Sequence, residues 1–325
     1  MTREERIARA EAAFAAHKAA YYRRGEYRGA DFWDFAEIFE IADDLYEITG
    51  DRSLFGQFAE MADFAVRTWG EDWEKNPYND DIMWLVIAFA RAYLFSGEAR
   101  YLALARLNFD KTFARAASDD LGGGLWWRIE NETKNACVNG PGAVAAAYLA
   151  AATGDGGYYD KAAFCLRWEI DNLFAPQSGK VYDAKRADGH VNTWSSTYNQ
   201  GTFIGACLAM WKHTGEEMYK TYALRAADYT MQEMYHGGVM NNEESGNDLP
   251  GFKGILARYL RRLARETGEE KYLAWLRLNA ESAWENRNAL GLMGTQLAEK
   301  TGEGAAYDVF TMSAAVSVVV NAAGE

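Results

Sequence analysis

The sequence predicts an all-α protein with the (α/α)6 barrel architecture, in which six inner and six outer helices form one domain over residues 1–325. A turn segment recurs along the chain, and the helices on either side of it alternate between apolar and amphipathic character. Composition favours the same class, because alanine-rich runs are frequent and only four prolines occur in 325 residues. The hydrophobic fraction of 49% allows a large core.

The recurring segment is a tight turn between two helices. It occurs five times, for example as ITGDRSLF and ETGEEKYL, and each copy places Asp or Glu directly after a glycine. Glycine readily adopts the left-handed conformation that follows a helix end, and an acidic residue favours the first turn of the next helix. The five glycines are Gly50, Gly97, Gly154, Gly215 and Gly268.

Helical periodicity fills the intervals between these turns. The helix before a turn is apolar on all sides, as in GPGAVAAAYLAAATG, whereas the helix after it has a polar face, as in EEKYLAWLRLNAESAW. The first kind is typical of a buried helix and the second of an outer one. A superhelical stack of hairpins would use the same pattern, but six pairs of this length usually close. The predicted helices span 2–23, 31–49, 52–69, 80–96, 99–116, 135–153, 157–174, 197–214, 216–234, 250–267, 269–287 and 307–322.

The connections between these helices are unequal. Those from an inner to an outer helix are short, whereas those from an outer to an inner helix are long. The long connections are 70–79, 117–134, 175–196, 235–249 and 288–306. They therefore lie at the end of the barrel where the inner helices begin, and we expect the functional site at that end.

Charge and composition exclude several kinds of partner. A formal net charge of −13 disfavours nucleic acid and anionic membrane surfaces, and it fits a protein that handles neutral ligands. No apolar run is long enough to cross a bilayer, so we expect no membrane insertion. No spaced cluster of His, Cys and carboxylates occurs, so we expect no metal and no cofactor. We also expect a monomer.

The cysteines and the first residues predict a compartment. Cys137, Cys165 and Cys207 are odd in number, lie far apart and lack CxxC pairing, which indicates free buried thiols in a reducing environment. The start, MTREERIARAEAAF, is a charged amphipathic helix without the apolar core of a signal peptide. We therefore expect a cytoplasmic protein, or a secreted one if a signal peptide has been removed.

Carboxylates, amides and aromatic rings gather where the predicted inner helices begin. Pyranose faces stack on Trp and Tyr, and sugar hydroxyls bond to amides and carboxylates, so this mixture predicts a carbohydrate site. Lys253 also stands at a helix start, where a cation opposes the helix dipole and where a surface charge is the plain alternative. The candidate substrate-binding residues are Trp33, Tyr78, Trp126, Trp127, Asn135, Tyr198, Asn199, Gln200, Asp248, Lys253 and Asp308.

Asp80 and Asp81 stand side by side at the start of the second inner helix, in NPYNDDIMWLVIAFARAY. One interpretation is helix capping, in which Asn79 or Asp80 accepts backbone N–H bonds and Asp81 complements the dipole. The other is a catalytic pair. Backbone N–H groups stabilise one carboxylate as an anion, while the second, crowded by a like charge and desolvated by aromatic rings, retains a proton. Glycosidic cleavage needs two such groups.

Four segments together resemble glycoside hydrolase family 76, the bacterial and fungal α-1,6-mannanases. They are YNDDIMWLVIAFARAY, GGGLWWRIENETKNA, STYNQGTFIGA and FKGILARYL, and the resemblance covers roughly 30–320. It implies an (α/α)6 barrel, retention of configuration, and a mannan or mannooligosaccharide substrate cleaved at α-1,6 linkages, as by an endo-α-1,6-mannanase. Carried over by position, it implies that Asp80 is the nucleophile and Asp81 the acid/base. Asn79 departs from the aromatic residue or Asp typical of the family, which implies a modest change in a subsite.

Three alternatives stay open at this point. Another (α/α)6 carbohydrate enzyme, such as an unsaturated-glycoside hydrolase, would use one aspartate to hydrate an enol ether. A sugar epimerase, the other enzyme within this first alternative, would depend on histidines, of which the chain has four. A catalytically inactive glycan-binding barrel would keep the aromatic and amide groups, and a helical scaffold for protein partners would need neither.

Overall fold

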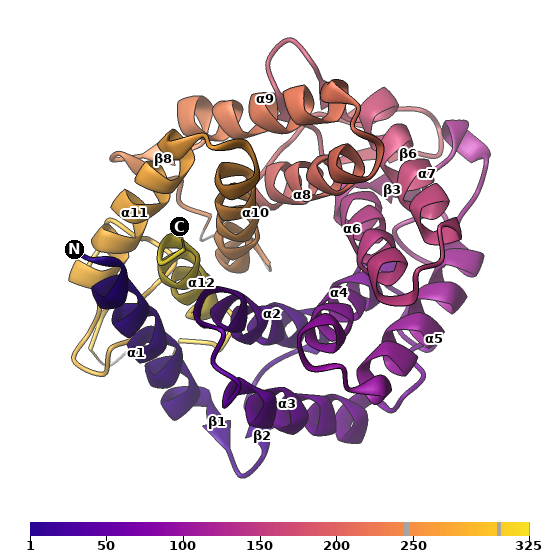
Figure 1. The fold of residues 1–325 in the computed structure, drawn as a ribbon. Helices are drawn as coiled ribbons and strands as arrows, with labels where there is room; N and C mark the ends of the chain where they lie inside the picture. Colours follow the sequence, from indigo (N-terminus) through magenta and orange to yellow (C-terminus); the bar gives the residue numbers. More distant parts are fainter. Residues whose placement is uncertain (244–247, 304–306, 325) are drawn as a thin grey trace. The chain divides into compact units, whose positions relative to one another are not determined.

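The computed structural model describes residues 1–243, 248–303 and 307–324, and twelve α-helices make up most of this part of the chain (Figure 1). The helices are α1 (Arg3–Tyr21), α2 (Phe32–Thr49), α3 (Leu54–Trp69), α4 (Asn79–Ser96), α5 (Ala99–Ala116), α6 (Ala136–Thr153), α7 (Gly157–Asn172), α8 (Thr197–Thr214), α9 (Glu217–Glu233), α10 (Phe252–Thr267), α11 (Glu270–Glu285) and α12 (Ser313–Ala322). None of these described helices combines the length and the apolarity needed to cross a membrane.

The predicted helices and turns are confirmed with one exception. Eleven helices begin and end within two residues of the predicted ranges. The five turn glycines have φ between +68° and +78°, the left-handed conformation for which glycine was expected. The exception is α12, which begins at Ser313 rather than at 307. The Asp308 side chain there accepts a hydrogen bond from the Thr311 N–H (2.7 Å), and this local bond competes with helix formation.

Short strands, which the sequence did not predict, occupy the long connections. Three pairs are β1 (Tyr22–Arg23) with β2 (Glu26–Tyr27), β4 (Phe174–Ala175) with β5 (Lys180–Val181), and β8 (Tyr235–His236) with β9 (Val239–Met240). A three-stranded antiparallel sheet has the order β3 (Thr133–Asn135), β6 (Ala184–Arg186) and β7 (Val191–Asn192). Two 3-10 turns cover Asp120–Gly122 and Leu249–Gly251. The connections 235–249 and 288–306 lie partly outside the described residues.

Contacts divide the chain into two compact units. Unit 1 comprises Met1–Phe64, Ser196–Gly201 and Thr230–Glu325, and unit 2 comprises Ala65–Ser195 and Thr202–Tyr229. In unit 1, α12 packs against α1, α2, α10 and α11. In unit 2, α4 packs against α5 and α6, and α6 packs against α7. The helices predicted to be apolar on all sides, such as α4 and α6, are buried along most of their length.

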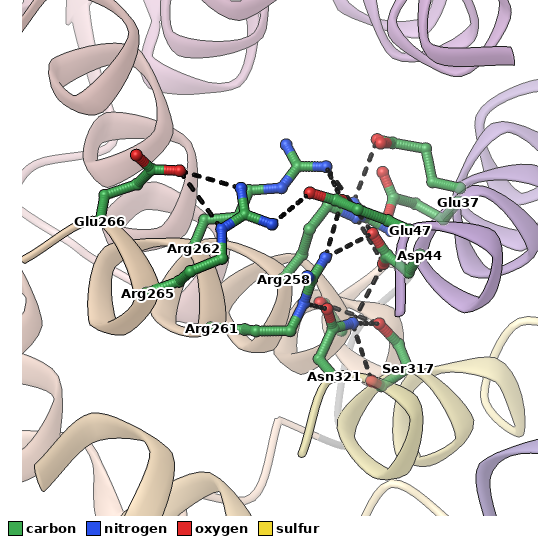
Figure 2. A network of polar contacts seen from close by, with 12 residues as sticks. Glu37, Asp44, Glu47, Arg258, Arg261, Arg262, Arg265, Glu266, Ser317 and Asn321 are labelled. Carbon is green, nitrogen blue, oxygen red and sulfur yellow. Dashed lines mark hydrogen bonds and ion pairs between the residues drawn. The ribbon is translucent and has the colours of Figure 1, made fainter. Parts of the chain in front are cut away.

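A network of buried charges joins α2, α10 and α12 within unit 1 (Figure 2). At its centre the Arg258 side chain is fully buried and donates to Glu37 (3.0 Å), Glu40 (3.1 Å) and Asp44 (2.9 Å) of α2. Asn321 of α12 donates a further hydrogen bond to Asp44 (3.0 Å). Since carboxylates three or four positions apart share one helix face, α2 presents its acids together to the arginine.

The network extends toward the end of α10. Glu47 of α2 accepts from Arg261 (2.9 Å), Arg262 (3.0 Å) and Arg265 (2.8 Å). Arg265 is 44% exposed, so these contacts pass from the buried centre at Arg258 to the solvent.

Candidate active site

The predicted site residues fall into two groups, one in each unit. The group in unit 2 is built on the start of α4. The N-cap of α4 is Tyr78, whose side chain forms no capping hydrogen bond. Asn79 Nδ2 donates instead to the Trp126 carbonyl (2.8 Å) and its Oδ1 accepts from Arg115 (2.6 Å). Neither Asn79 nor Asp80 is therefore the N-cap, and capping alone does not account for the adjacent acids.

Asp80 and Asp81 differ in burial. Asp80 is 8% exposed, and burial raises the pKa of its carboxyl to about 7, against the opposing effects of Cys137, Trp127 and the first N–H groups of the helix. Asp81 is half-buried, and its Oδ2 accepts a hydrogen bond from Asn76 Nδ2 (2.9 Å). Successive helix positions point about 100° apart, so the two carboxylates leave the helix in different directions.

The tryptophan pair is fixed directly against this helix start. The Asn79 N–H donates to the Trp127 carbonyl (2.8 Å), in addition to the bond from its side chain to the Trp126 carbonyl. The rings of Tyr78 and Trp127 have centroids 5.6 Å apart, and the Arg128 guanidinium lies over Tyr78 (4.7 Å). The structure therefore brings Tyr78, Trp126 and Trp127 together at the helix start that carries the aspartates.

Several buried polar atoms near Asp80 have no hydrogen-bond partner among the described residues. They are Asp80 Oδ1, Trp127 Nε1 and Asn135 Oδ1. Trp127 lies close enough to lower the pKa of Asp80, although its N–H does not reach hydrogen-bond geometry with Oδ1. Asn135 is the N-cap of α6, and its side chain makes no capping bond. Buried polar atoms are normally satisfied, so this group of donors and acceptors is suited to a ligand rich in hydroxyls.

Three further residues lie beside this group, and no sequence pattern indicated them there: Cys137, Asp183 and Arg115. Cys137 contacts Asp80. It is partly exposed, so its prediction as a buried thiol was wrong, whereas Cys165 and Cys207 are buried as predicted. All three cysteines are free thiols. Burial and the neighbouring Asp80 and Asp183 raise the pKa of the Cys137 thiol well above its usual value. Arg115 donates to the carbonyls of Glu74 (2.7 Å) and Asn76 (2.7 Å) and so supports the segment before α4.

The glycine-rich segment before the tryptophans needs glycine at position 124. Gly124 has φ of +79°, and a Cβ there would lie 2.6 Å from the Trp168 ring and 2.9 Å from Asn139 Oδ1. Gly122 has φ of +89°, but a Cβ there would meet nothing within 4 Å. The two positions therefore share backbone strain and differ only in the available space.

We expect Gly124→Ala to destabilise the protein more than Gly122→Ala. A left-handed non-glycine residue costs about 1–2 kcal/mol at either position, and overpacking adds roughly 1–3 kcal/mol at Gly124. Urea unfolding of both variants measures the difference. An equal decrease in the free energy of unfolding in both variants would show that Trp168 and Asn139 move to accept the new Cβ without an energetic cost.

The group in unit 1 gathers around Trp33. Its Nε1 donates to Asp248 (3.3 Å), and its ring packs edge-on against Phe310 (4.4 Å). Burial raises the pKa of the neighbouring Asp34 to about 7. Asp248 and Asp308 are exposed, and Asp308 uses both carboxylate oxygens to bind Thr311.

The remaining predicted residues of unit 1 are buried. Tyr198, Asn199 and Gln200 occupy the start of α8, and Asn199 Oδ1 accepts from both the N–H (2.8 Å) and the hydroxyl (2.6 Å) of Ser196. Lys253 is fully buried, donates to Thr295 (3.0 Å) and faces Glu243 at 4.0 Å. Lys253 is therefore not a surface charge, and Asn199 fixes the backbone at Ser196. No cluster of three His, Cys, Asp or Glu residues within the described ranges has the geometry of a metal site.

Paired carboxylates beside aromatic rings are the groups that a glycoside hydrolase uses, and an all-α chain that carries them at its helix starts fits the helical class of these enzymes. The model of glycosyl hydrolase family 76 matches residues 7–324, and the chain belongs to that family. The α-1,6-mannanase of Salegentibacter sp. HEL1_6 is 30% identical, with a TM-score of 0.91 over 98% of this chain and 99% of that one. The predicted (α/α)6 fold class and family are confirmed.

Two further comparisons concern substrate and length. A second structure of the Salegentibacter enzyme, 29% identical to this chain over 98% of it, is an inactive variant with two adjacent aspartates replaced by asparagine, in complex with α-1,6-mannotriose. The mannan endo-1,6-α-mannosidase of Eremothecium gossypii is 25% identical over 69% of this chain and 56% of its own length. A Saccharomyces cerevisiae relative is 28% identical over 57% of this chain and 45% of its own. The chain thus spans about half the length of the curated relatives it matches.

Proposed function

We propose that this protein is a retaining glycoside hydrolase that cleaves α-1,6-linked mannosides in mannan or mannooligosaccharides. The observation that carries the proposal is the pair of carboxylates on successive positions at the start of α4, one buried and one half-buried, beside buried polar atoms that lack a partner among the described residues. The Salegentibacter relative supports the proposal, because its inactive variant carries asparagine in place of two adjacent aspartates.

In this mechanism Asp80 attacks the anomeric carbon and Asp81 protonates the leaving glycosidic oxygen. A covalent glycosyl–enzyme intermediate forms, and water deprotonated by Asp81 then releases the product with its configuration retained. Asn76 orients the Asp81 carboxyl through its hydrogen bond of 2.9 Å. Cys137 and the N–H groups of the first helical turn favour the ionised form of Asp80 that attack requires.

The other predicted residues take two kinds of role in the proposal. Tyr78, Trp126, Trp127 and Asn135 position the sugar beside the aspartates. In unit 1, Trp33, Asp248 and Asp308 are candidate sugar contacts because they are at least partly exposed. Tyr198, Asn199, Gln200 and Lys253 are buried, as Trp126 and Asn135 are, and they too stay candidate sugar contacts of unit 1 in the proposal. We also propose that 1–325 acts as one catalytic domain, which the family match over residues 7–324 supports.

The proposal is tested by NMR of the anomeric protons during digestion of an α-1,6-mannooligosaccharide. We expect the α-anomer of the reducing end to appear first and to mutarotate afterwards. Early β-anomer would indicate inversion and would overturn the nucleophilic role of Asp80. Absence of cleavage together with binding measured by calorimetry would favour a glycan-binding protein without turnover.

A further inference from the structure

Lys134 is a fully buried cation near the predicted site, and it forms no ion pair with the residues that the structure describes. It lies in β3, and its Nζ is close to the backbone carbonyl oxygens of Ser118 (2.8 Å), Asp120 (2.7 Å), Gly123 (2.5 Å) and Gly124 (3.2 Å). A lysine ammonium carries three N–H donors, so this cage satisfies all of them. The face of Trp126 lies 4.8 Å from the same nitrogen and adds a cation–π contact.

The caged segment depends on this ammonium for its hydrogen bonds. Leu121, Gly122, Gly123 and Gly124 all have positive φ, a run that an α-helix or a strand does not accommodate. Of the four carbonyls around the ammonium, those of Asp120 and Gly124 also accept backbone N–H groups, from Gly123 (3.3 Å) and Ser118 (3.2 Å), whereas those of Ser118 and Gly123 bond to Lys134 alone among the described residues. Removing the Lys134 side chain would therefore leave the Ser118 and Gly123 carbonyl oxygens without their donor and would weaken the bonding of the other two.

The segment leads directly to the catalytic helix. The Trp126 N–H donates to the Ala116 carbonyl (3.0 Å), so this hydrogen bond attaches the segment to the last residue of α5. The Trp126 and Trp127 carbonyls then accept the two hydrogen bonds of Asn79, from Nδ2 (2.8 Å) and from the backbone N–H (2.8 Å). Asn79 precedes Asp80, so hydrogen bonds and covalent bonds connect the ammonium without a break to the first turn of α4.

We propose that Lys134 is a positioning residue for the aspartate pair: its ammonium holds the segment 118–127, and that segment fixes the first turn of α4 through Asn79. The inference rests on the proposed function for its kinetic consequences. Its structural part, which is the dependence of the Asp80 environment on Lys134, does not require any particular substrate.

The first experiment compares Lys134→Met with Lys185→Met. Lys185 pairs with Lys134 across β3 and β6, and its Nζ donates to the Asn172 side chain (2.7 Å) on partly exposed surface, so it is a matched control. With an α-1,6-mannooligosaccharide we expect kcat to fall by roughly 10–100-fold in Lys134→Met, as for groups that orient a reacting residue, while KM changes less. Lys185→Met should stay within about twofold of the original protein, a surface change of ordinary size.

A double-mutant cycle tests the route, that is, whether Lys134 acts on the aspartates through Asn79. If Lys134 acts through Asn79, the effects of Lys134→Met and Asn79→Ala on kcat overlap, and the double variant is scarcely slower than the slower single variant. Effects that multiply would overturn the route, and an unchanged kcat in folded Lys134→Met would overturn the proposal. Should Lys134→Met fail to fold, Lys134→Arg keeps a cation whose planar fork does not fit the cage, and it enters the same cycle.

A second readout needs no substrate. Cys137 touches Asp80 and is the partly exposed thiol among the three cysteines, so its rate of alkylation reports on the geometry around Asp80. We expect labelling of Cys137, located by peptide mass spectrometry, to be several-fold faster in Lys134→Met and unchanged in Lys185→Met. If the original protein cleaves no mannoside yet labelling accelerates, the proposed function fails and the positioning role stands. If it cleaves mannoside while labelling and kcat are both unchanged, the positioning role fails.

Discussion

Asp80→Asn is expected to abolish hydrolysis of α-1,6-mannooligosaccharides while leaving the protein folded. Loss of a nucleophile lowers turnover by roughly 10⁴-fold or more, and loss of the acid/base in Asp81→Asn by roughly 10²–10⁴-fold. The fold should survive for the following reason. The pKa of the Asp80 carboxyl is higher in the folded protein than in the unfolded chain, so ionising it lowers the free energy of unfolding as pH rises through about 7. Asparagine removes that cost. Initial rates, with circular dichroism to monitor folding, measure both effects.

The control for these variants is Asp160→Asn, an exposed acid in the first turn of α7. It shares the helix-start position and should retain full activity. Near-normal rates in both Asp80→Asn and Asp81→Asn would contradict the assignment of the pair.

The pH dependence of kcat/KM separates the two roles within the pair. A nucleophile must be ionised, so with the pKa of Asp80 at about 7 we expect kcat/KM to fall tenfold per unit as pH decreases below that value. If Asp80 were instead the proton donor, the same pKa would produce a decline as pH increases above 7. A pH–rate profile between pH 4 and 9 therefore distinguishes the assignment from its reverse.

Arg258→Met is expected to be the most destabilising substitution in unit 1. It removes the cation shared by Glu37, Glu40 and Asp44, and loss of one partner from a buried ion pair costs about 3–5 kcal/mol. Burial raises the pKa of Glu37 to about 7 even with the arginine present. Protonated Glu37 therefore adds to the free energy of unfolding at low pH, and this contribution is lost as pH rises through 7. Arg258 favours the ionised form of Glu37, so the loss of stability in Arg258→Met should be larger at pH 8, where that carboxyl ionises, than at pH 5, as urea unfolding at both values would measure.

Arg265→Met is the matched control on the same helix. Arg265 binds Glu47 but is 44% exposed, and exposed pairs contribute about 0–1 kcal/mol. A comparable loss in both variants, or a cost of Arg258→Met that does not change with pH, would contradict the assignment of Arg258 as the centre of the network.

The helices of this fold were predictable because each carries a local signal. The glycine–acid turns set the helix boundaries, and the apolar runs of α4 and α6 indicated burial. The arginines of α10 carried the opposite signal, since a sequence with four arginines among sixteen residues is typical of an exposed face. Burial of Arg258 depends on acids of α2 more than 200 positions away, and no local pattern contains that information.

The site was predictable to a more limited degree. Adjacent aspartates and paired tryptophans at helix starts indicated the group around Asp80, because both patterns are local. The strands β3, β6 and β7 are too short for a periodic signal, so the placement of Lys134 and Asp183 beside the site was not predicted. Lys253 was taken as a candidate contact from its position at a helix start, and its partner Glu243 lies in a connection that the sequence could not place.

The contrast between the turns and the connections bears on how such a scaffold diverges over generations. Each short turn is set by a single left-handed glycine, so the helix hairpins keep their packing whatever the longer segments contain. Lengthening a surface loop costs little, because closure entropy grows only slowly with length. The segment 117–134 is less free, since Gly124 and Lys134 leave few alternatives for its backbone. Inherited changes in sugar preference should therefore accumulate in 175–196, while 117–134 changes slowly.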